Sequence, residues 1–265
     1  MPKALRFLLT IAAIALFAAT ASAEYDDPWS DLQEAIFPGK TIADGAAFMR
    51  LAAPERAYDA AVVPVDVAFD KARLPAAVRS LTLIVDKNPA PVAAVFHFTD
   101  QVANPSIGIR LRIDQYTNLH AVAETADGRL YGVAKFVKAA GGCSAPATKS
   151  PEEARAHKGQ MKLKTLQQAF ASRFNRMELM IRHPNNSGLQ MDPLTRYYVP
   201  ADFVQKIDIS LAGKPVLSVE GNISISENPA IQFWLKSGAA GDLKVEAEDS
   251  SGRKFDATWP LPLAS

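Results

Sequence analysis

The residue best suited to chemistry in this 265-residue sequence is its single cysteine, Cys143. A thiolate is the nucleophile that forms sulfur–sulfur bonds. Cys143 follows Gly141 and Gly142 and precedes Ser144-Ala145-Pro146, a run of small residues that is typical of a loop. A buried structural cysteine more often lies inside an apolar periodic segment. The sequence therefore predicts an exposed, reactive thiol, with an incidental free cysteine as the alternative.

The histidines are weaker candidates for a site. His97 alternates with two phenylalanines, so we expect it on the solvent face or at the edge of a strand. His183 precedes a proline at a predicted strand end, which favours a structural or interface role, with help in docking the thiol segment as the alternative. His120 and His157 show no metal-ligand spacing with another ligand residue, so no metal is expected.

Enzymatic motifs are missing from the sequence. It contains no Ser-His-Asp set, no phosphate-binding loop and no haem-binding cysteine pair. One cysteine and four histidines also exclude a multi-disulfide framework and zinc sites of four cysteines or of two cysteines and two histidines. We therefore expect no cofactor, and an enzyme acting alone is disfavoured.

The overall composition is that of an ordinary globular protein. The chain is 48% hydrophobic and 22% charged, and its length suits one large or two ordinary domains. Lys and Arg total 29 against 28 for Asp and Glu, which leaves no basic excess for a phosphate backbone. Nucleic-acid binding is therefore not expected as the primary role.

Residues 1–23 have the features of a secretory signal peptide. Lys3 and Arg6 make the start positive, residues 8–19 are apolar but too short to span a bilayer comfortably, and residues 21–23 read Ala-Ser-Ala before the expected cleavage site. An uncleaved membrane anchor is the disfavoured alternative. We expect the mature chain in the periplasm. That compartment favours paired cysteines, so a lone cysteine there is inert, joined to another molecule, or kept as a working thiol.

Alternating apolar residues before the thiol segment predict half-buried strands. In one, the apolar side carries Val63, Val65, Val67 and Phe69. In another, Ile107, Ile109, Leu111 and Ile113 oppose the polar residues Arg110, Arg112 and Asp114. Further strands are expected over residues 81–85, 92–99, 121–124 and 129–137, the last two joined by an Asp127-Gly128 hairpin turn. A short helix with Asp27 as N-cap and Pro28 at its first position is expected near the mature N-terminus.

The second half is also rich in predicted strands. Ser150-Pro151-Glu152-Glu153 predicts a short helix that Gly159 ends. Strands are expected over residues 161–165, where the spacing also suits a helix, and over 207–211, 243–247 and 254–259. No strand–helix–strand alternation occurs, which excludes a doubly wound nucleotide-binding sheet. The sequence predicts an all-β fold of two immunoglobulin-like β-sandwich domains, with a boundary in residues 144–159.

Several stretches of the sequence carry a resemblance to known carriers. In the first half these are residues 44–51 (DGAAFMRL), 62–65 (VVPV), 85–91 (VDKNPAP) and the terminal Gly141-Gly142-Cys143, which resemble SoxY of the Sox sulfur-carrier complex. In the second half, Arg182-His183-Pro184 with Ser187-Gly188-Leu189, residues 199–204 (VPADFV), Asn228-Pro229 with residues 231–233 (IQF), and Asp249 with Gly252 resemble SoxZ.

The resemblance implies a natural fusion of the two proteins. Its expected parts are a signal peptide at 1–23, a SoxY-like domain at 24–143, a linker at 144–159 and a SoxZ-like domain at 160–265. The sequence looks most like the fused carriers associated with quinoprotein dehydrogenases.

The same resemblance implies a covalent carrier and not an enzyme. In that family a cysteine on a mobile glycine-rich arm takes up a sulfur compound such as thiosulfate and presents it to periplasmic enzymes. Cys143 matches the attachment cysteine, and Gly141 and Gly142 match the flexible part of the arm. The implied partners are a Sox-type cytochrome or hydrolase, or a quinoprotein dehydrogenase with its c-type cytochrome, with no nucleic acid and no membrane after signal cleavage. The alternative is a non-covalent adaptor for such a PQQ-type dehydrogenase and its cytochrome.

The sequence departs from the family at the arm. In SoxY the arm ends the chain as Gly-Gly-Cys-Gly-Gly, whereas here Cys143 is followed by Ser144, Ala145, Pro146 and a second domain. A loop fixed at both ends explores less space than a free tail, and Pro146 stiffens it further. We therefore expect a cargo or partner set different from that of the thiosulfate pathway.

Overall fold

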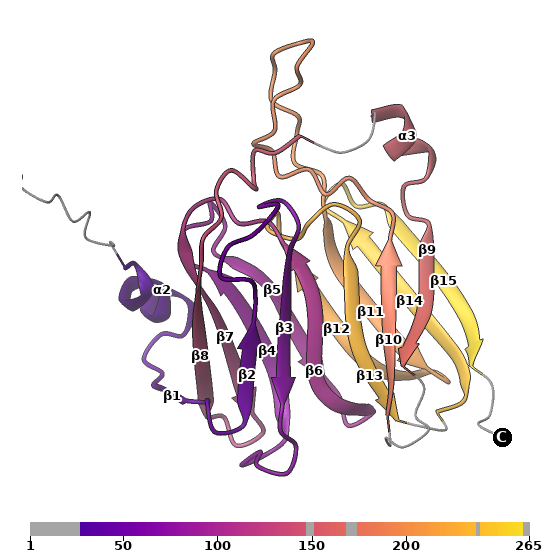
Figure 1. Ribbon diagram of the computed structural model, residues 1–265. Helices are drawn as coiled ribbons and strands as arrows, with labels where there is room; N and C mark the ends of the chain where they lie inside the picture. The colour runs from indigo at the N-terminus through magenta and orange to yellow at the C-terminus, as the bar shows by residue number, and fades with distance from the viewer. Residues whose placement is uncertain (1–26, 147–150, 168–173, 237–238, 262–265) are drawn as a thin grey trace, which may run out of the picture.

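The structure is a computed structural model that describes residues 27–146, 151–167, 174–236 and 239–261 (Figure 1). Two sheets, of nine and six strands, lie face to face, and two helices are described, α2 (Trp29–Ile36) and α3 (Pro151–Ala156). The expected signal peptide lies outside the described residues. Within the described ranges, no helix is long and apolar enough to cross a membrane.

The strands are antiparallel to their neighbours, except that β1 runs parallel to β8 among the described pairs. In spatial order, the nine-stranded sheet contains β1 (Ile42–Asp44), β8 (Leu130–Val137), β7 (Thr117–Thr125), β4 (Val78–Val85), β5 (Val92–Phe98), β12 (Lys214–Gly221), β11 (Val204–Leu211), β14 (Gly241–Asp249) and β15 (Lys254–Leu261). The six-stranded sheet contains β2 (Met49–Ala52), β3 (Val63–Phe69), β6 (Val102–Leu111), β13 (Ala230–Lys236), β10 (Phe174–Ile181) and β9 (Met161–Gln167).

Both sheets continue from the N-terminal half of the chain into the C-terminal half. β5 pairs with β12 in the larger sheet, and β6 pairs with β13 in the smaller one (Figure 1). One cluster of buried apolar side chains extends through both halves. The predicted all-β fold of two immunoglobulin-like sandwiches is confirmed, and the structure adds that the sandwiches share their sheets. The shared pairing covers four strand edges that separate sandwiches would leave open.

The predicted alternation is present in the strands. In β3 the side chains of Val63, Val65, Val67 and Phe69 are buried while those between them are not. The segment at 161–167 is a strand, β9, which resolves the ambiguity between strand and helix. The helix predicted after the thiol segment is α3, and Gly159 beyond it adopts the left-handed conformation, with φ of 86°.

The N-terminal helix begins one residue later than predicted. The Asp27 carboxylate accepts a hydrogen bond from the Trp29 amide at 3.1 Å, so Asp27 satisfies a free amide at the helix start. Trp29 stacks on His120 with ring centroids 3.6 Å apart, and His120 Nε2 lies 3.1 Å from Asp86 Oδ2. These contacts attach α2 to the outer face of the larger sheet. His97 is exposed on β5, as predicted, and contacts Glu220 across the junction of the halves.

Candidate functional site

Cys143 lies six residues after the end of β8, and its side chain is completely buried. The sequence predicted an exposed thiol on a flexible loop, and this prediction is wrong for the structure. We refer to residues 141–143 as the arm. On one side the arm contacts Ile113 and Asp114, which follow β6. On the other side it contacts a loop of the C-terminal half.

The main chain of the arm is held by hydrogen bonds to Ile113 and Asp114. The Gly141 amide donates to the Asp114 carbonyl oxygen at 2.8 Å, and the Gly142 amide donates to the Ile113 carbonyl oxygen at 3.0 Å. The Cys143 amide donates to Asp114 Oδ1 at 3.3 Å. The arm is therefore docked in a defined conformation.

The two glycines of the arm meet different requirements. Gly141 has φ of 77°, a left-handed conformation that other residues adopt at a cost, but open space surrounds its missing side chain. A Cβ on Gly142 would lie 2.1 Å from the Ala60 carbonyl oxygen and 2.6 Å from that of Ile113. Since both obstacles are main chain, only glycine fits at position 142 when the arm is docked. The sequence attributed both glycines to flexibility, and the docked arm gives each an additional structural reason.

A loop between β10 and β11, residues 183–190, covers the arm from the C-terminal half, and we call it the covering loop. Ser187 Oγ donates a hydrogen bond to the Cys143 carbonyl oxygen. Arg112 donates from Nη1 to the Gly142 carbonyl oxygen at 3.1 Å and from Nη2 to the Asn185 carbonyl oxygen at 3.4 Å. Arg112 thus joins the arm to the covering loop.

Arg112 is the important site residue that the sequence misplaced. Alternation put it on the polar side of a strand, but only 1% of the residue is exposed. The reason is that the C-terminal half lies over this end of β6, where the Arg112 amide donates to the Ser224 carbonyl oxygen. Nothing in the local pattern distinguishes a solvent-facing arginine from one covered by a second domain.

The docked thiol is in its protonated, unreactive form. Burial raises the pKa of Cys143 to about 12, the nearby Asp114 carboxylate raises it as well, and the positive charge of Arg112 opposes both effects only in part. Because the thiolate is the reactive species, chemistry at neutral pH requires the arm to leave this position.

Ser187→Ala tests whether the covering loop restrains the arm. The variant loses the hydrogen bond to the Cys143 carbonyl oxygen and, within the covering loop, the one that Ser187 Oγ accepts from the Leu189 amide. Since the bond to the arm contributes about 1 kcal/mol, we expect roughly fivefold faster labelling of the thiol by a neutral alkylating reagent. Ser144→Ala is the matched control, because Ser144 Oγ donates to the Gly141 carbonyl oxygen, three residues before it, and not to the covering loop. Equal labelling rates for both variants and the wild type would show that the covering loop does not hold the arm.

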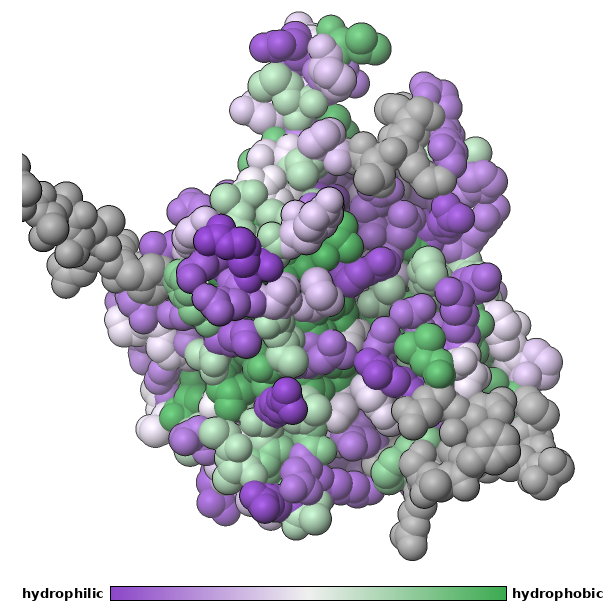
Figure 2. All heavy atoms as spheres, in the orientation of Figure 1, coloured by the Kyte–Doolittle hydropathy of each residue, from purple (hydrophilic) through white to green (hydrophobic). Residues whose placement is uncertain are grey.

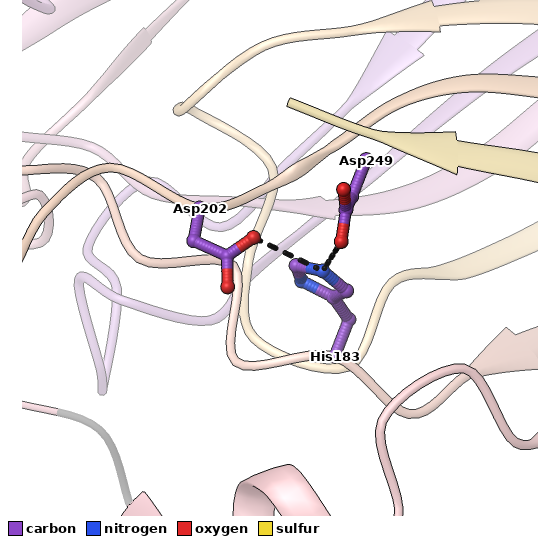
Figure 3. A group of neighbouring side chains, drawn as sticks. All are labelled: His183, Asp202 and Asp249. Carbon is purple, nitrogen blue, oxygen red and sulfur yellow. Dashed lines mark hydrogen bonds and ion pairs between the residues drawn. The ribbon is translucent and has the colours of Figure 1, made fainter. Parts of the chain in front are cut away.

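His183, the first residue of the covering loop, forms a cluster with Asp202 and Asp249, in which His183 and Asp249 are buried and Asp202 is partly exposed (Figure 3). His183 Nε2 is 3.4 Å from Asp249 Oδ2 and 3.7 Å from Asp202 Oδ1. Ligand atoms of the three residues lie within 4.8 Å of one another, so their types and spacing are compatible with a metal ion. However, Lys158 Nζ lies 2.6 Å from Asp249 and 2.8 Å from Asp202 and supplies the positive charge that a metal would otherwise bring.

His183 stabilises the main chain of the covering loop from within. Its Nδ1 accepts a hydrogen bond from the Asn185 amide at 3.0 Å, and Asn185 is held in a left-handed conformation with φ of 44°. Burial lowers the pKa of His183, and the charge of Lys158 lowers it further, which favours the neutral ring. Since Nδ1 accepts from the Asn185 amide, the proton of the neutral ring is on Nε2, which faces the two carboxylates. The structure places His183 in a structural position behind the arm, where its buried ring offers no surface to an external partner.

An exposed hairpin extends from the covering loop beyond the ends of the sheets (Figure 1). It carries Leu194, Tyr197 and Tyr198, whose exposed fractions are 91%, 77% and 64%. At its tip a hydrophobic group lies beside hydrophilic ones (Figure 2). Asp192 shapes the turn by accepting hydrogen bonds from the Leu194 and Thr195 amides. Exposed apolar groups of this kind are typical of a contact surface, and the sequence analysis did not identify them.

Fold and site together define a two-part β-sandwich protein that holds one thiol on a glycine arm at the junction of its halves. Residues 33–143 match the family model described as sulfur oxidation protein SoxY, and residues 163–260 match that described as sulphur oxidation protein SoxZ. The chain therefore belongs to these two families, joined in one polypeptide as a SoxYZ-like fusion. SoxY and SoxZ proteins are sulfur carriers in sulfur oxidation. The SoxY match ends at Cys143 itself.

No curated protein matches the chain. A superoxide reductase (neelaredoxin) from Ignicoccus hospitalis is 18% identical, with a TM-score of 0.30, over 41% of this chain and 90% of the reductase. A beta-glycosidase from Bacteroides vulgatus is 8% identical, with a TM-score of 0.25, over 80% of this chain and 24% of the glycosidase.

Proposed function

We propose that this protein is a periplasmic carrier that binds a sulfur-containing intermediate covalently through Cys143 and presents it to partner oxidoreductases. The observation that carries the proposal is the position of the only cysteine at the end of the SoxY match, on an arm that is held through hydrogen bonds of its own main-chain groups. Such contacts can be exchanged for water at a modest net cost. The signal-peptide features at residues 1–23 support the periplasmic location.

Attachment of thiosulfate to the arm would be an oxidation. The proton of the Cys143 thiol passes to solvent, and a bond forms between the cysteine sulfur and the outer sulfur of thiosulfate. Two electrons pass to an acceptor, which we take to be a partner cytochrome. The product is a thiosulfonate, in which the cargo ends in an SO₃⁻ group.

The proposal requires two positions of the arm. In the docked position the thiol is protonated and covered, and in the undocked position it meets a partner. Six residues separate Cys143 from the end of β8, so the extended chain could carry the sulfur about 20 Å. The exposed hairpin beside the arm is a suitable contact surface for the partner. Because the arm continues into the second half, the site that receives it is expected to be shallow.

A non-covalent adaptor for a quinoprotein dehydrogenase and its cytochrome is the second candidate. The complete burial of Cys143 and the exposed side chains of Leu194, Tyr197 and Tyr198 on the hairpin favour it, since an adaptor needs a contact surface and no reactive thiol. The two functions differ in their dependence on Cys143. Cys143→Ser should abolish the carrier function and leave an adaptor nearly intact.

The deciding experiment is the intact mass of the mature protein isolated from periplasm, before and after a mild reductant, with the adduct mapped by peptide. We expect a reductant-labile mass on Cys143 that corresponds to added sulfur or thiosulfonate, and none on Cys143→Ser. A bare thiol, even after incubation with thiosulfate and the oxidising partners, would contradict the carrier function and leave the adaptor.

A further inference from the structure

A cavity of about 380 Å³ opens beside the arm, between the two halves of the chain. Its lining includes Arg110 and Arg112, at the end of β6, and Arg182, directly after β10. Ala145 and Pro146, which follow the arm, complete the wall nearest to Cys143. The cavity is therefore built from both halves and from the tether that distinguishes this chain from a free-tailed carrier.

The cavity has an excess of positive charge. Three guanidinium groups line it against the carboxylates of Asp59 and Glu227. The Nε atoms of Arg110 and Arg112 are buried, and neither has a hydrogen-bond partner among the described residues. A buried guanidinium N–H without an acceptor is costly, so such a pair indicates an oxygen-rich ligand.

The cavity is within reach of the thiol. Ala145 is two residues beyond Cys143, so their Cα atoms are at most about 7 Å apart. On the other side, Arg112 donates to the carbonyl oxygen of Gly142, the residue before Cys143. The opposite charges of Arg112 and the Cys143 thiolate would also attract each other.

We propose that this cavity binds the anionic end of the cargo carried by Cys143, an SO₃⁻ group of the sulfonate type. The inference rests on the proposed carrier function and adds a binding site for the charged end of the cargo. Three oxygens of one anion match the parallel N–H groups that guanidinium presents, and hydrogen bonds between charged groups are the strong ones. An arm loaded with such a cargo stays docked, whereas a neutral cargo of the same length leaves the arginines without acceptors.

The test compares two adducts that have similar length and different charge. Tetrathionate converts the Cys143 thiolate to Cys–S–S–SO₃⁻ with release of thiosulfate, and methyl methanethiosulfonate converts it to Cys–S–S–CH₃ with release of methanesulfinate. The rate at which dithiothreitol removes each adduct is followed by intact mass. We expect the sulfonate adduct to be removed roughly tenfold faster in Arg182→Gln than in the wild type, with little change for the methyl adduct.

Arg182 is chosen because it is exposed, so its replacement leaves the core intact, whereas Arg112 also holds the arm. Arg110→Gln is the second variant and should act in the same direction. Arg73→Gln is the matched control, because Arg73 is exposed and pairs with Asp70, away from the cavity. Equal removal rates for the sulfonate adduct in Arg182→Gln, Arg110→Gln and the wild type would overturn the inference, as would equal acceleration of both adducts.

A second measurement separates this inference from the proposed function. Cys143→Ser cannot form a covalent adduct, so calorimetric titration with inorganic thiosulfate reports only on the cavity. Weak binding that Arg182→Gln reduces supports the cavity, even if Cys143 of the periplasmic protein carries no cargo. Native cargo on Cys143, with no arginine dependence in either measurement, would overturn the inference and leave the carrier function standing. If Arg182→Gln accelerates removal of the sulfonate adduct but free thiosulfate does not bind to Cys143→Ser, the cavity holds the anion only when it is attached to the arm, which also supports the inference.

Discussion

Gly142→Ala is expected to expel the arm and convert the buried thiol into an exposed, reactive one. The new methyl group would lie 2.1 Å from the Ala60 carbonyl oxygen and 2.6 Å from the Ala60 carbonyl carbon, and main chain cannot rotate away as a side chain can. The docked position is therefore closed to the variant. Once in water, the thiol regains an ordinary pKa, far below the value of about 12 that burial imposes.

The expected gain in reactivity is large. Several hydrogen bonds, worth about 1 kcal/mol each, hold the arm in the docked position. Loss of this position in Gly142→Ala should therefore accelerate thiol labelling at neutral pH roughly hundredfold. Labelling with a chromogenic disulfide reagent measures this rate directly. The global fold should be unaffected, because the arm lies at the ends of the sheets and contributes no strand to them.

Gly141→Ala is the matched control. Open space surrounds a methyl group at position 141, and the only penalty is the left-handed conformation with φ of 77°, about 1 kcal/mol. We expect it to label only a few times faster than the wild type. If the thiol is labelled at the same rate in Gly141→Ala and Gly142→Ala, the exposure of the thiol depends on the general flexibility of the arm and not on the close approach at Gly142.

These two variants also separate the two uses of a glycine pair. A carrier needs an arm that extends into a partner, and it also needs a position where the thiol is protected between transfers. Glycine at 142 serves the second need through its missing side chain, which lets two main-chain segments approach closely. A permanently expelled arm should therefore load cargo readily in vitro and lose it readily to reductants.

The individual strands were predictable because their residues alternate in polarity. The buried positions of β3 and the hairpin at Asp127-Gly128 follow directly from period and turn chemistry. The joining of the halves through β5 with β12 and β6 with β13 was not predictable. These strands have ordinary alternation, and which edge a strand pairs with depends on contacts distant in sequence.

The position of the reactive residue was predictable from the sequence, but the burial of its thiol was not. The glycine-cysteine run identified the thiol, yet small residues are typical both of mobile loops and of segments packed closely against main chain. The docked arm is held in part by Ser187, 44 residues away, and by Arg112, 31 residues before Cys143 in the sequence. No local signal links these residues to the arm.

Asp249→Asn is expected to cause the largest loss of stability among the variants discussed. Asp249 is fully buried and accepts hydrogen bonds from Lys158, from Ser251 and from the Arg253 amide. The neutral amide keeps the shape but leaves the nearly buried ammonium of Lys158 with less compensation. Removing one partner of a buried ion pair costs about 3 kcal/mol or more, which urea denaturation at neutral pH would measure.

The pH dependence of this loss has a definite sign. Burial alone would raise the pKa of Asp249, but the hydrogen bonds from Lys158, Ser251 and the Arg253 amide outweigh it and hold the pKa well below its usual range. A carboxylate with a lowered folded pKa stabilises the fold above its unfolded pKa, near 4, and this contribution fades as the pH falls toward the folded value. The difference between wild type and Asp249→Asn should therefore be constant near neutral pH and shrink below about pH 4.

Asp202→Asn provides the comparison that makes the result specific. Asp202 contacts the same lysine at 2.8 Å, but 28% of its side chain is exposed, so water compensates for part of the lost charge. We expect a loss of about 1 kcal/mol, since partly exposed ion pairs contribute little. The cluster holds His183 and therefore the covering loop, which in turn holds the arm through Ser187. We therefore also expect the Cys143 thiol to be labelled faster in Asp249→Asn than in Asp202→Asn. Equal losses of stability for the two variants, or a difference that persists unchanged in acid, would show that the buried carboxylate is not the anchor of this cluster.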